Sequence, residues 1–321
     1  MSAPIVVTGA SGFIGRNTVA ALNRRGVSNI LLVDRLHRNE KWRNLRGLEY
    51  EDLIEPPSLF HWLESTEHDV ETIIHLGACT STTETDAAFL LENNYRYTRR
   101  LCEWALANNC RFIYASSAAT YGDGSAGYSD ADDVTPQLRP LNMYGYSKHM
   151  FDLWALRHRL FDRIVGLKFF NVFGPYEGHK GDMRSVVAKA YEEVTKTGHI
   201  SLFKSYRDGI AHGEQRRDFI YVDDAVKVIL HFVDHRDEAG LVNCGTGRAR
   251  TWLDLARAVF SGLELEPNIR FIDMPEALRD KYQYFTEARV DKLRATGFQD
   301  QFVELEDGIG DYLRTYLTPG R

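Results

Sequence analysis

Cysteine is scarce in this chain, and its spacing points neither to a metal site nor to a disulfide framework. The 321 residues include four cysteines, none of which forms a CxxC pair or another spacing typical of metal ligands. Because nothing in the sequence indicates export, we expect free thiols with structural roles in a reducing cytoplasm, and no bound metal. The four are Cys79, Cys102, Cys110 and Cys244.

Long apolar runs and an excess of positive charge are also lacking. The apolar run 5–7 ends at Thr8 and Gly9, and no later run approaches the ~20 residues needed to span a bilayer. We therefore expect a cytoplasmic protein with neither signal peptide nor anchor. With 39 lysines and arginines against 45 acidic residues the net charge is −6, so we expect no nucleic-acid or membrane partner.

A glycine-rich turn near the N-terminus predicts dinucleotide binding. The buried strand expected at 5–7 is followed by Gly9, Gly12 and Gly15 at GxxGxxG spacing, and then by an amphipathic stretch that extends to Arg25. Such glycines allow a tight turn and let a pyrophosphate approach the amides at a helix N-terminus. The spacing is not GxGxxG, but the strand-turn-helix context favours a cofactor site over a plain loop.

An acidic residue ends the next buried strand, which is expected at 30–33. Asp34 lies about twenty residues after the glycine turn, where a ribose-binding acid is expected, and on its own it indicates NAD. Arg35, Arg38 and Lys41 follow, and cations at these positions are able to hold the 2′-phosphate of NADP. A solvated charged loop explains each of them singly about as well. The sequence therefore leans toward NADP and leaves NAD open.

The remaining pattern of apolar runs predicts an α/β fold built on an open, doubly wound parallel sheet. Strands are expected at 50–53, 73–78, 112–115 and 164–169, with a long helix at 87–108. Residues 219–222 and the helix after them are expected to return to this sheet region, and 241–247 is expected to form a short strand and a plain glycine turn. Helices at 183–198, 251–263 and 302–317 are expected outside the sheet, the last two in a smaller domain with Thr251 and Gln301 near their starts.

A tyrosine and a lysine four residues apart predict a proton-transfer pair. Tyr144 and Lys148 would lie on the same face of a helix. A phenol with a pKa near ~10 is a poor base, and an adjacent cation favours the phenolate. Taken alone, this spacing is more often an exposed pair on an amphipathic helix. Ser116, Ser117 and Thr120 follow the strand at 112–115, and their hydroxyls are able to bond a substrate beside the phenol.

Three motifs together resemble those of the extended short-chain dehydrogenase/reductase family. They are GxxGxxG, the Ser-Ser-Ala-x-x-Tyr-Gly segment and the Tyr-x-x-x-Lys pair. The resemblance implies that Ser117, Tyr144 and Lys148 form the catalytic group, with Tyr144 as acid/base and Lys148 lowering its pKa and holding the nicotinamide ribose. The cofactor contacts that it implies are Gly9, Gly12, Phe13, Ile14, Gly15, Asp34, Arg35, Lys41, Asp52, Leu53, Leu76, Gly77, Ala78, Cys79, Asn93, Tyr144, Lys148 and Val172.

Further segments are similar to those of the ADP-glycero-manno-heptose 6-epimerases. These segments are 77–84, 93–95, 169–181 and 282–286. The resemblance implies that Lys180 is a second acid/base, although a phosphate-binding or surface lysine explains the pattern alone equally well. It implies substrate contacts at Ser117, Asn171, Asp182, Lys189, Phe203, Arg217 and Tyr282, with Arg217 at the sugar-nucleotide phosphates.

The substrate half departs from the family pattern at several positions. Asp182 stands where a serine is usual, Lys189 where a substrate-contacting histidine is usual, and the loop 205–215 is longer. An aspartate near a diphosphate would repel it unless a cation such as Lys189 or Arg184 compensates. These differences concern the identity of the sugar more than the cofactor chemistry.

The resemblance also implies two domains with different ligands, and a reaction. Residues 1–170 plus about 218–248 would bind NADP in a Rossmann-like domain, and about 171–217 plus 249–321 would form a smaller, interleaved α/β substrate domain. The implied reaction is epimerisation at C6 of ADP-D-glycero-D-manno-heptose by transient oxidation. A homo-oligomer is implied, with a pentamer as one candidate, and a role in supplying the inner-core heptose of bacterial lipopolysaccharide.

Two alternatives stay open. One is another nucleotide-sugar epimerase or dehydratase, although Ala118 stands where dehydratases usually carry an acid. The other is a non-catalytic NADP-binding protein, although such proteins typically lose the Tyr or the Lys of the pair, and both are present here.

Overall fold

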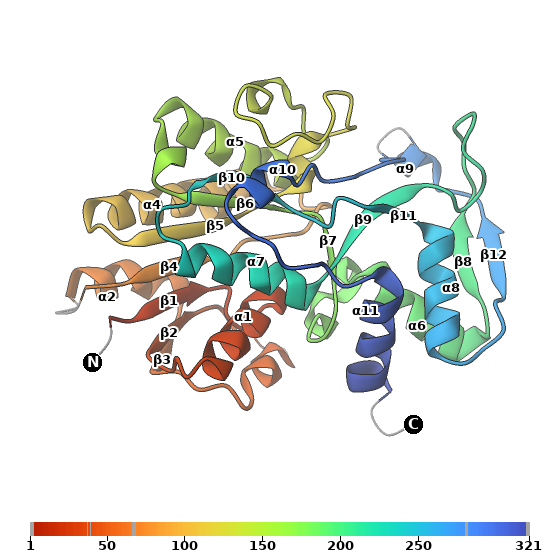
Figure 1. Ribbon diagram of the computed structural model, residues 1–321, viewed down its shortest axis with the longest axis horizontal. Helices are drawn as coiled ribbons and strands as arrows, with labels where there is room; N and C mark the ends of the chain where they lie inside the picture. Colours follow the sequence, from red (N-terminus) through yellow and green to blue (C-terminus); the bar gives the residue numbers. More distant parts are fainter. Residues whose placement is uncertain (1–2, 37, 39, 66–68, 280–281, 319–321) are drawn as a thin grey trace.

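The computed structural model describes residues 3–36, 38, 40–65, 69–279 and 282–318, and its centre is a parallel sheet flanked by helices (Figure 1). Seven strands lie in the order β10-β6-β5-β4-β1-β2-β3, and every neighbouring pair is parallel. The predicted Rossmann-like sheet is therefore confirmed. The strands are β1 (Ile5–Thr8), β2 (Ile30–Val33), β3 (Asp52–Ile54), β4 (Thr72–His75), β5 (Arg111–Ser117), β6 (Val165–Phe169) and β10 (Gly240–Cys244).

Helices cover both faces of the large sheet, which explains its continuous apolar strands. In β1, Ile5 and Val7 pack in one core cluster, while Val6 packs in another on the opposite face. The first face carries α1 (Phe13–Arg24) and α7 (Val222–Asp234), and the second carries α2 (Leu59–Ser65), α4 (Tyr97–Ala107) and α5 (Met143–Arg157) (Figure 1). Within the described ranges, no helix is both long enough and apolar enough to cross a membrane.

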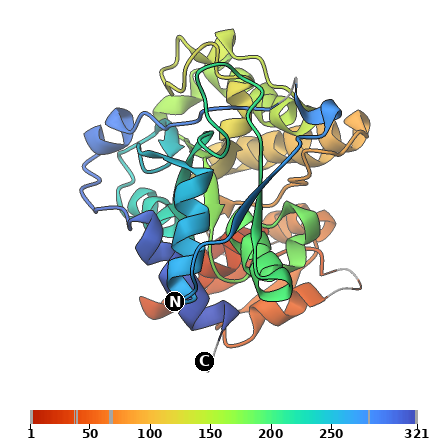
Figure 2. The same cartoon turned by 90° about the vertical axis from the view of Figure 1, so that its right-hand side faces the viewer.

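A smaller part of the molecule contains two short sheets. One has the order β11-β9-β7, and the other pairs β12 with β8. Figure 2 shows the helices of this part toward the viewer. Its strands are β7 (Asn171–Phe173), β8 (Ile200–Phe203), β9 (Arg216–Tyr221), β11 (Ala249–Thr251) and β12 (Ile269–Ile272), and its main helices are α6 (Val186–Thr197), α8 (Trp252–Gly262) and α11 (Leu305–Tyr312). Because α7 and β10 return to the large sheet between β9 and β11, the two parts interleave.

The strand expected at 219–222 does not join the large sheet. It is part of β9, which pairs with β7 and β11, and the return is made by α7 and β10. A continuous apolar run predicts a strand that is buried on both faces, but it does not predict which strand lies beside it. The domain boundaries drawn from the sequence stay a prediction.

Several helix boundaries also differ from the sequence-based ones. The helix expected at 87–108 is divided into α3 (Ala87–Leu90), a π-helical turn at Leu91–Arg96 and α4. The helix expected at 183–198 begins at Val186, because Ser185 caps it by accepting a bond from the Ala188 amide at 3.3 Å. Thr251 caps α8 as expected, whereas α11 begins after Glu304 instead of near Gln301.

The order of the strands places a ligand site at one edge of the sheet. From β1 the chain adds β2 and β3 on one side, whereas β4, β5, β6 and β10 lie on the other. Ligands of open parallel sheets bind where the order reverses, beyond the carboxyl ends of the strands. The glycine turn after β1 and the segment after β4 meet at this point.

Candidate active site

A pocket of about 1070 Å³ lies beyond the carboxyl ends of β1, β4, β5 and β6 and is lined by both parts of the molecule. Most residues that the sequence singled out lie on its wall: Gly9, Gly12, Phe13, Ile14, Gly15, Asp34, Lys41, Leu76, Gly77, Ala78, Ser117, Tyr144, Lys148, Asn171, Val172, Lys180, Arg217 and Tyr282. Others lie outside its lining, and their roles stay predictions: Arg35, Asp52, Leu53, Cys79, Asn93, Asp182, Lys189 and Phe203.

The glycine turn is tight enough to exclude side chains at two positions. Gly9 has a φ of +68°, and a Cβ there would lie 2.7 Å from the amide nitrogen of Gly77. A Cβ at Gly15 would lie 2.1 Å from the carbonyl oxygen of Gly9. The first turn of α1 carries no acidic residue, and its N-cap, Gly12, has no side chain that could accept from the free amides. The N-terminus of α1 is therefore suited to an anion such as a pyrophosphate.

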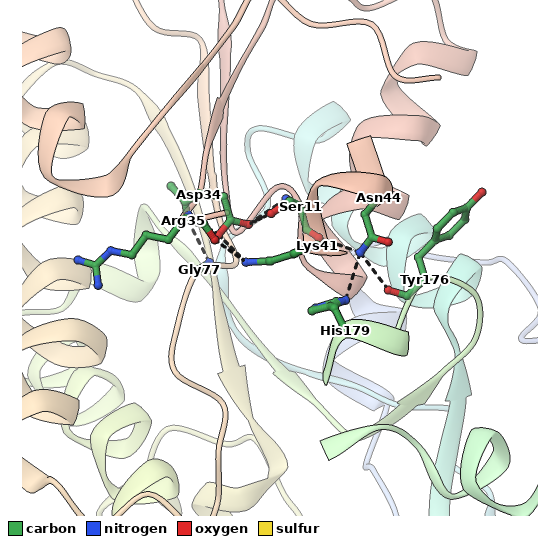
Figure 3. A network of polar contacts seen from close by, with 9 residues as sticks. Ser11, Asp34, Arg35, Lys41, Asn44, Gly77, Tyr176 and His179 are labelled. Carbon is green, nitrogen blue, oxygen red and sulfur yellow. Dashed lines mark hydrogen bonds and ion pairs between the residues drawn. The ribbon is translucent and has the colours of Figure 1, made fainter. Parts of the chain in front are cut away.

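Asp34 is saturated with hydrogen-bond donors (Figure 3). Its Oδ2 accepts from the Ser11 amide at 2.9 Å and the Ser11 hydroxyl at 2.6 Å. Its Oδ1 accepts from the Arg35 amide at 2.7 Å and the Lys41 ammonium at 2.6 Å. A carboxylate has about four acceptor positions, so all of them are engaged here. The Arg35 side chain points away from Lys41 (Figure 3).

Tyr144 and Lys148 lie on the first turns of α5, as predicted. Asn142 caps the helix by accepting from the Gly145 amide at 2.8 Å, and both side chains line the pocket. Ser117, at the end of β5, makes a side-chain hydrogen bond with Tyr144 that lowers its pKa. The structure therefore brings together the three residues of the predicted catalytic group.

Burial is the main influence on the pKa values of both Tyr144 and Lys148. Burial raises the pKa of Tyr144, and the bond with Ser117 offsets only part of that effect. Lys148 is itself buried, which lowers its pKa to about 8, with Asp152 acting in the opposite direction. The lowering of the Tyr144 pKa by Lys148, which the family resemblance implies, stays a prediction.

Lys180 reaches the pocket from the turn before α6. Its Nζ lies 5.3 Å from the centre of the Phe13 ring, above the glycine turn. Burial lowers the pKa of Lys180, opposed by Glu177 and reinforced by Lys189. Its half-buried position on the pocket wall argues against the surface-lysine interpretation.

Arg217 is a buried cation that faces the pocket. Its guanidinium lies 5.1 Å from the Tyr282 ring and 5.6 Å from the Trp252 ring, and the Trp252 indole donates to the Tyr282 hydroxyl at 2.8 Å. Burial lowers its pKa. No carboxylate in the described part of the chain forms an ion pair with it, and the groups whose charged forms influence its pKa are the Tyr282 and Tyr128 phenols. A buried guanidinium without an acid partner is suited to bind an anionic ligand.

The cations suggested to compensate Asp182 are Lys189 and Arg184. Arg184 lines the pocket, but it pairs with Glu192. Asp182 and Lys189 are exposed. The Phe203 ring packs edge-on against Tyr282 at 6.4 Å, so it lies one side chain away from the pocket.

Sequence reasoning missed a buried asparagine and most of one wall. Asn94, beside the predicted Asn93, bonds the Cys79 amide and carbonyl at 2.9 Å and the Ser147 hydroxyl at 3.0 Å. It ties the segment after β4 to α5. The wall also includes polar residues to which sequence reasoning assigned no role, among them Thr80, Thr82, Thr83, Glu84, Thr85, Gln283 and Thr286. The segment 77–84 was recognised as a motif, but roles were assigned only to its first three residues.

Comparison with known proteins identifies the family. The NAD dependent epimerase/dehydratase family model matches residues 5–245. An ADP-L-glycero-D-manno-heptose-6-epimerase of Nitratidesulfovibrio vulgaris is 52% identical over 314 residues, 97% of each chain. One of Fusobacterium nucleatum is 45% identical, over 98% of each chain. The solved Helicobacter pylori ADP-L-glycero-D-manno-heptose-6-epimerase is 25% identical, with a TM-score of 0.81 over 97% of this chain and 95% of that one. The chain belongs to the NAD dependent epimerase/dehydratase family.

Proposed function

We propose that this protein epimerises C6 of the heptose of ADP-D-glycero-D-manno-heptose, giving ADP-L-glycero-D-manno-heptose, with tightly bound NADP. The observation that carries the proposal is a pocket lined by two proton-transfer candidates from separate elements, Tyr144 on α5 and Lys180 on the turn before α6. High identity to heptose epimerases over nearly the whole chain supports the choice of sugar. A cytoplasmic homo-oligomer that supplies lipopolysaccharide heptose stays a prediction of the sequence.

The chemistry requires a base for each orientation of the C6 hydroxyl. When bound, the nicotinamide accepts a hydride from C6 and returns it to the other face of the ketone, so there is no net oxidation. Tyr144 would accept the hydroxyl proton of one epimer, and Lys180 would donate the proton that completes the other. Ser117 would hold the C6 oxygen beside Tyr144, while Arg217 would bind the diphosphate.

The saturation of Asp34 supports NADP over NAD. In NAD sites a carboxylate at this position accepts bonds from the ribose hydroxyls. Asp34 has no acceptor position left while Lys41 and Ser11 are bonded to it. The Lys41 ammonium also neutralises the charge that would repel a 2′-phosphate. We therefore propose that Lys41 contacts that phosphate.

Incubation with ADP-D-glycero-D-manno-heptose tests the function directly. NMR should show the C6 epimer as the product without added reductant, and mass spectrometry of the cofactor released on denaturation should identify NADP. A product that has lost water would instead indicate a dehydratase. An unchanged sugar, with a loaded cofactor and a folded chain, would contradict the proposal.

Replacing Arg217 with leucine is expected to raise KM about 10- to 100-fold, because a charge-assisted hydrogen bond contributes about 1.5–3 kcal/mol. The cofactor content should not change, since the glycine turn is untouched. Arg216→Leu is the matched control, because the Arg216 side chain is exposed on the same strand. Steady-state kinetics on both variants measures the effect, and equal KM values for the two would argue against a phosphate contact at Arg217.

A further inference from the structure

One side chain joins the turn that carries Lys180 to the cofactor end of the pocket. Asn44 lies on the 3₁₀ helix Glu40–Leu45 and is 8% exposed. Its Nδ2 donates to the Ser11 carbonyl at 2.9 Å and to the Tyr176 carbonyl at 3.3 Å, and lies 3.1 Å from His179 Nδ1 (Figure 3). The amide therefore contacts both the glycine turn and the segment immediately before Lys180.

The contact with His179 requires a neutral ring whose Nδ1 accepts. Burial, with Lys41 and Lys180 acting in the same direction, lowers the pKa of His179 to about 4. Near pH 7 the imidazole is thus uncharged, and in the tautomer with a bare Nδ1 it shares the two Asn44 amide protons with the Ser11 and Tyr176 carbonyls. His179 precedes Lys180 directly, so a bond that fixes His179 also limits where the Lys180 backbone can lie.

The same segment is held in an unusual backbone conformation. Tyr176 has a φ of +74°, a region that non-glycine residues seldom adopt. The Arg16 guanidinium of α1 lies 3.6 Å from the centre of the Tyr176 ring, and Asn17 Nδ2 donates to the Pro175 carbonyl at 3.1 Å. Such a conformation persists only where its surroundings hold it, and Asn44 supplies the bond to the Tyr176 carbonyl.

The other end of the turn is anchored separately. The buried Glu177 accepts from the amide and the hydroxyl of Ser185, which caps α6, both at 2.5 Å. This anchors the turn to the substrate side of the pocket. Asn44 and α1 anchor it to the cofactor side, so the Lys180 ammonium is positioned between the two.

We propose that Asn44 is a positioning residue for Lys180, joining the glycine turn that receives the cofactor to the turn that carries the second base. The proposal rests on the proposed role of Lys180 in epimerisation. It links two parts of the reaction, since a cofactor bound at the glycine turn and Lys41 would stabilise the same 3₁₀ helix that holds the Lys180 turn. Asn44 itself touches no reacting atom.

Asn44→Leu removes the donor with little change in volume. It is expected to lower kcat roughly 10- to 100-fold, because a displacement of about 1 Å of a catalytic group has effects of that size. KM for the sugar nucleotide, and the amount of cofactor found by mass spectrometry of the denatured protein, should stay within about twofold of wild type, since Arg217 and the glycines are intact. Thermal unfolding checks that the variant is folded.

Asn23→Leu is the matched control. Asn23 Nδ2 also donates to two carbonyls, Val27 at 2.9 Å and Glu49 at 2.8 Å, and so also joins α1 to a distant segment, but it lies at the other end of α1. If the kcat of Asn23→Leu falls as far as that of Asn44→Leu, the effect is general loosening and the proposal is wrong. Should Asn44→Leu not fold, Asn44→Ala also removes the donor without adding a charge and carries the same expectation.

A double-mutant cycle separates this proposal from the role of Lys180 itself. If Asn44 acts through Lys180, Asn44→Leu should have no further effect on kcat in a Lys180→Met background. Additive losses, or a loss of cofactor that matches the loss of rate, would mean that Asn44 acts on the cofactor turn and would overturn the inference. Full activity of Lys180→Met alone would refute the two-base function, and the inference with it.

Discussion

Lys180→Met is expected to slow interconversion of the two heptose epimers by about 10²- to 10⁴-fold, the range for loss of a general acid or base. Methionine keeps a long apolar side chain against Phe13, which the Lys180 ammonium overlies at 5.3 Å. The fold and the bound cofactor should therefore be retained. Lys196→Met, at an exposed position on α6, is the control for loss of a lysine.

The two-base mechanism makes a sharper prediction for the separate half-reactions. Each epimer presents its hydroxyl proton to a different base, so Lys180→Met should still oxidise one epimer and fail with the other. Tyr144→Phe should show the reverse pattern. Stopped-flow absorbance of the reduced cofactor, recorded with each epimer, distinguishes these cases. If both variants fail with the same epimer, then Lys180 is not the second base.

The pH dependence supplies an independent check on the same variant. A lysine acts as a base only when neutral, and burial lowers the pKa of Lys180 from its ordinary value. The wild-type rate of the half-reaction that uses Lys180 should therefore fall as the pH drops through that lowered pKa. The residual rate of Lys180→Met should lack this dependence.

The buried strands, the glycine turn and the Tyr144/Lys148 pair were predictable, because each depends on a short segment of sequence. Parallel strands covered on both faces are continuous apolar runs, such as Ile30–Val33. No other residue can replace Gly15 in the turn, because a Cβ there would lie 2.1 Å from the Gly9 carbonyl oxygen. A helix places residues four apart on one face, which made Tyr144 and Lys148 a pair. These features follow from periodicity and from steric limits within a short segment.

The features that escaped prediction depend on geometry that no short segment contains. The helix after β4 has a π-helical turn at Leu91–Arg96, which shifts the phase of the residues that follow. Asn94 lies within this turn and bonds the segment after β4, a role that the sequence did not predict. Similarly, the Tyr144 pKa is set by burial that the chain acquires only when β5, α5 and the loop after β4 meet.

A second large effect is expected beneath the catalytic group, at a fully buried ion pair. The Lys168 ammonium of β6 lies 3.1 Å from Asp152 Oδ2, and both side chains are 0% exposed. Lys168 also donates to the Thr120 hydroxyl at 2.7 Å, and Asp152 accepts from the Tyr114 and Ser116 hydroxyls at 2.7 and 2.8 Å. The pair therefore joins β6 to α5, one helical turn after Lys148, and the Tyr114 and Ser116 hydroxyls connect β5 to the same carboxylate.

Lys168→Met is expected to lower the free energy of unfolding by about 3–5 kcal/mol, because it leaves the Asp152 carboxylate buried without its partner. The change in volume is small, so the loss arises from the uncompensated charge. Urea unfolding followed by fluorescence measures it, together with the slope of the transition to confirm two-state behaviour. The activity should fall as well, since the Thr120 hydroxyl bonds the Ser117 carbonyl at 2.8 Å.

The double variant Lys168→Met/Asp152→Asn tests the origin of that loss. It removes both charges while the asparagine carbonyl still accepts a hydroxyl, so it should recover a large part of the stability lost by Lys168→Met. Lys204→Met is the matched control, because Lys204 lies the same 3.1 Å from Asp273 but the two side chains are 38% and 69% exposed. Its unfolding free energy should change by no more than about 1 kcal/mol. A double variant less stable than Lys168→Met would show that the hydrogen-bond network around Asp152, and not its unpaired charge, sets the stability of this region.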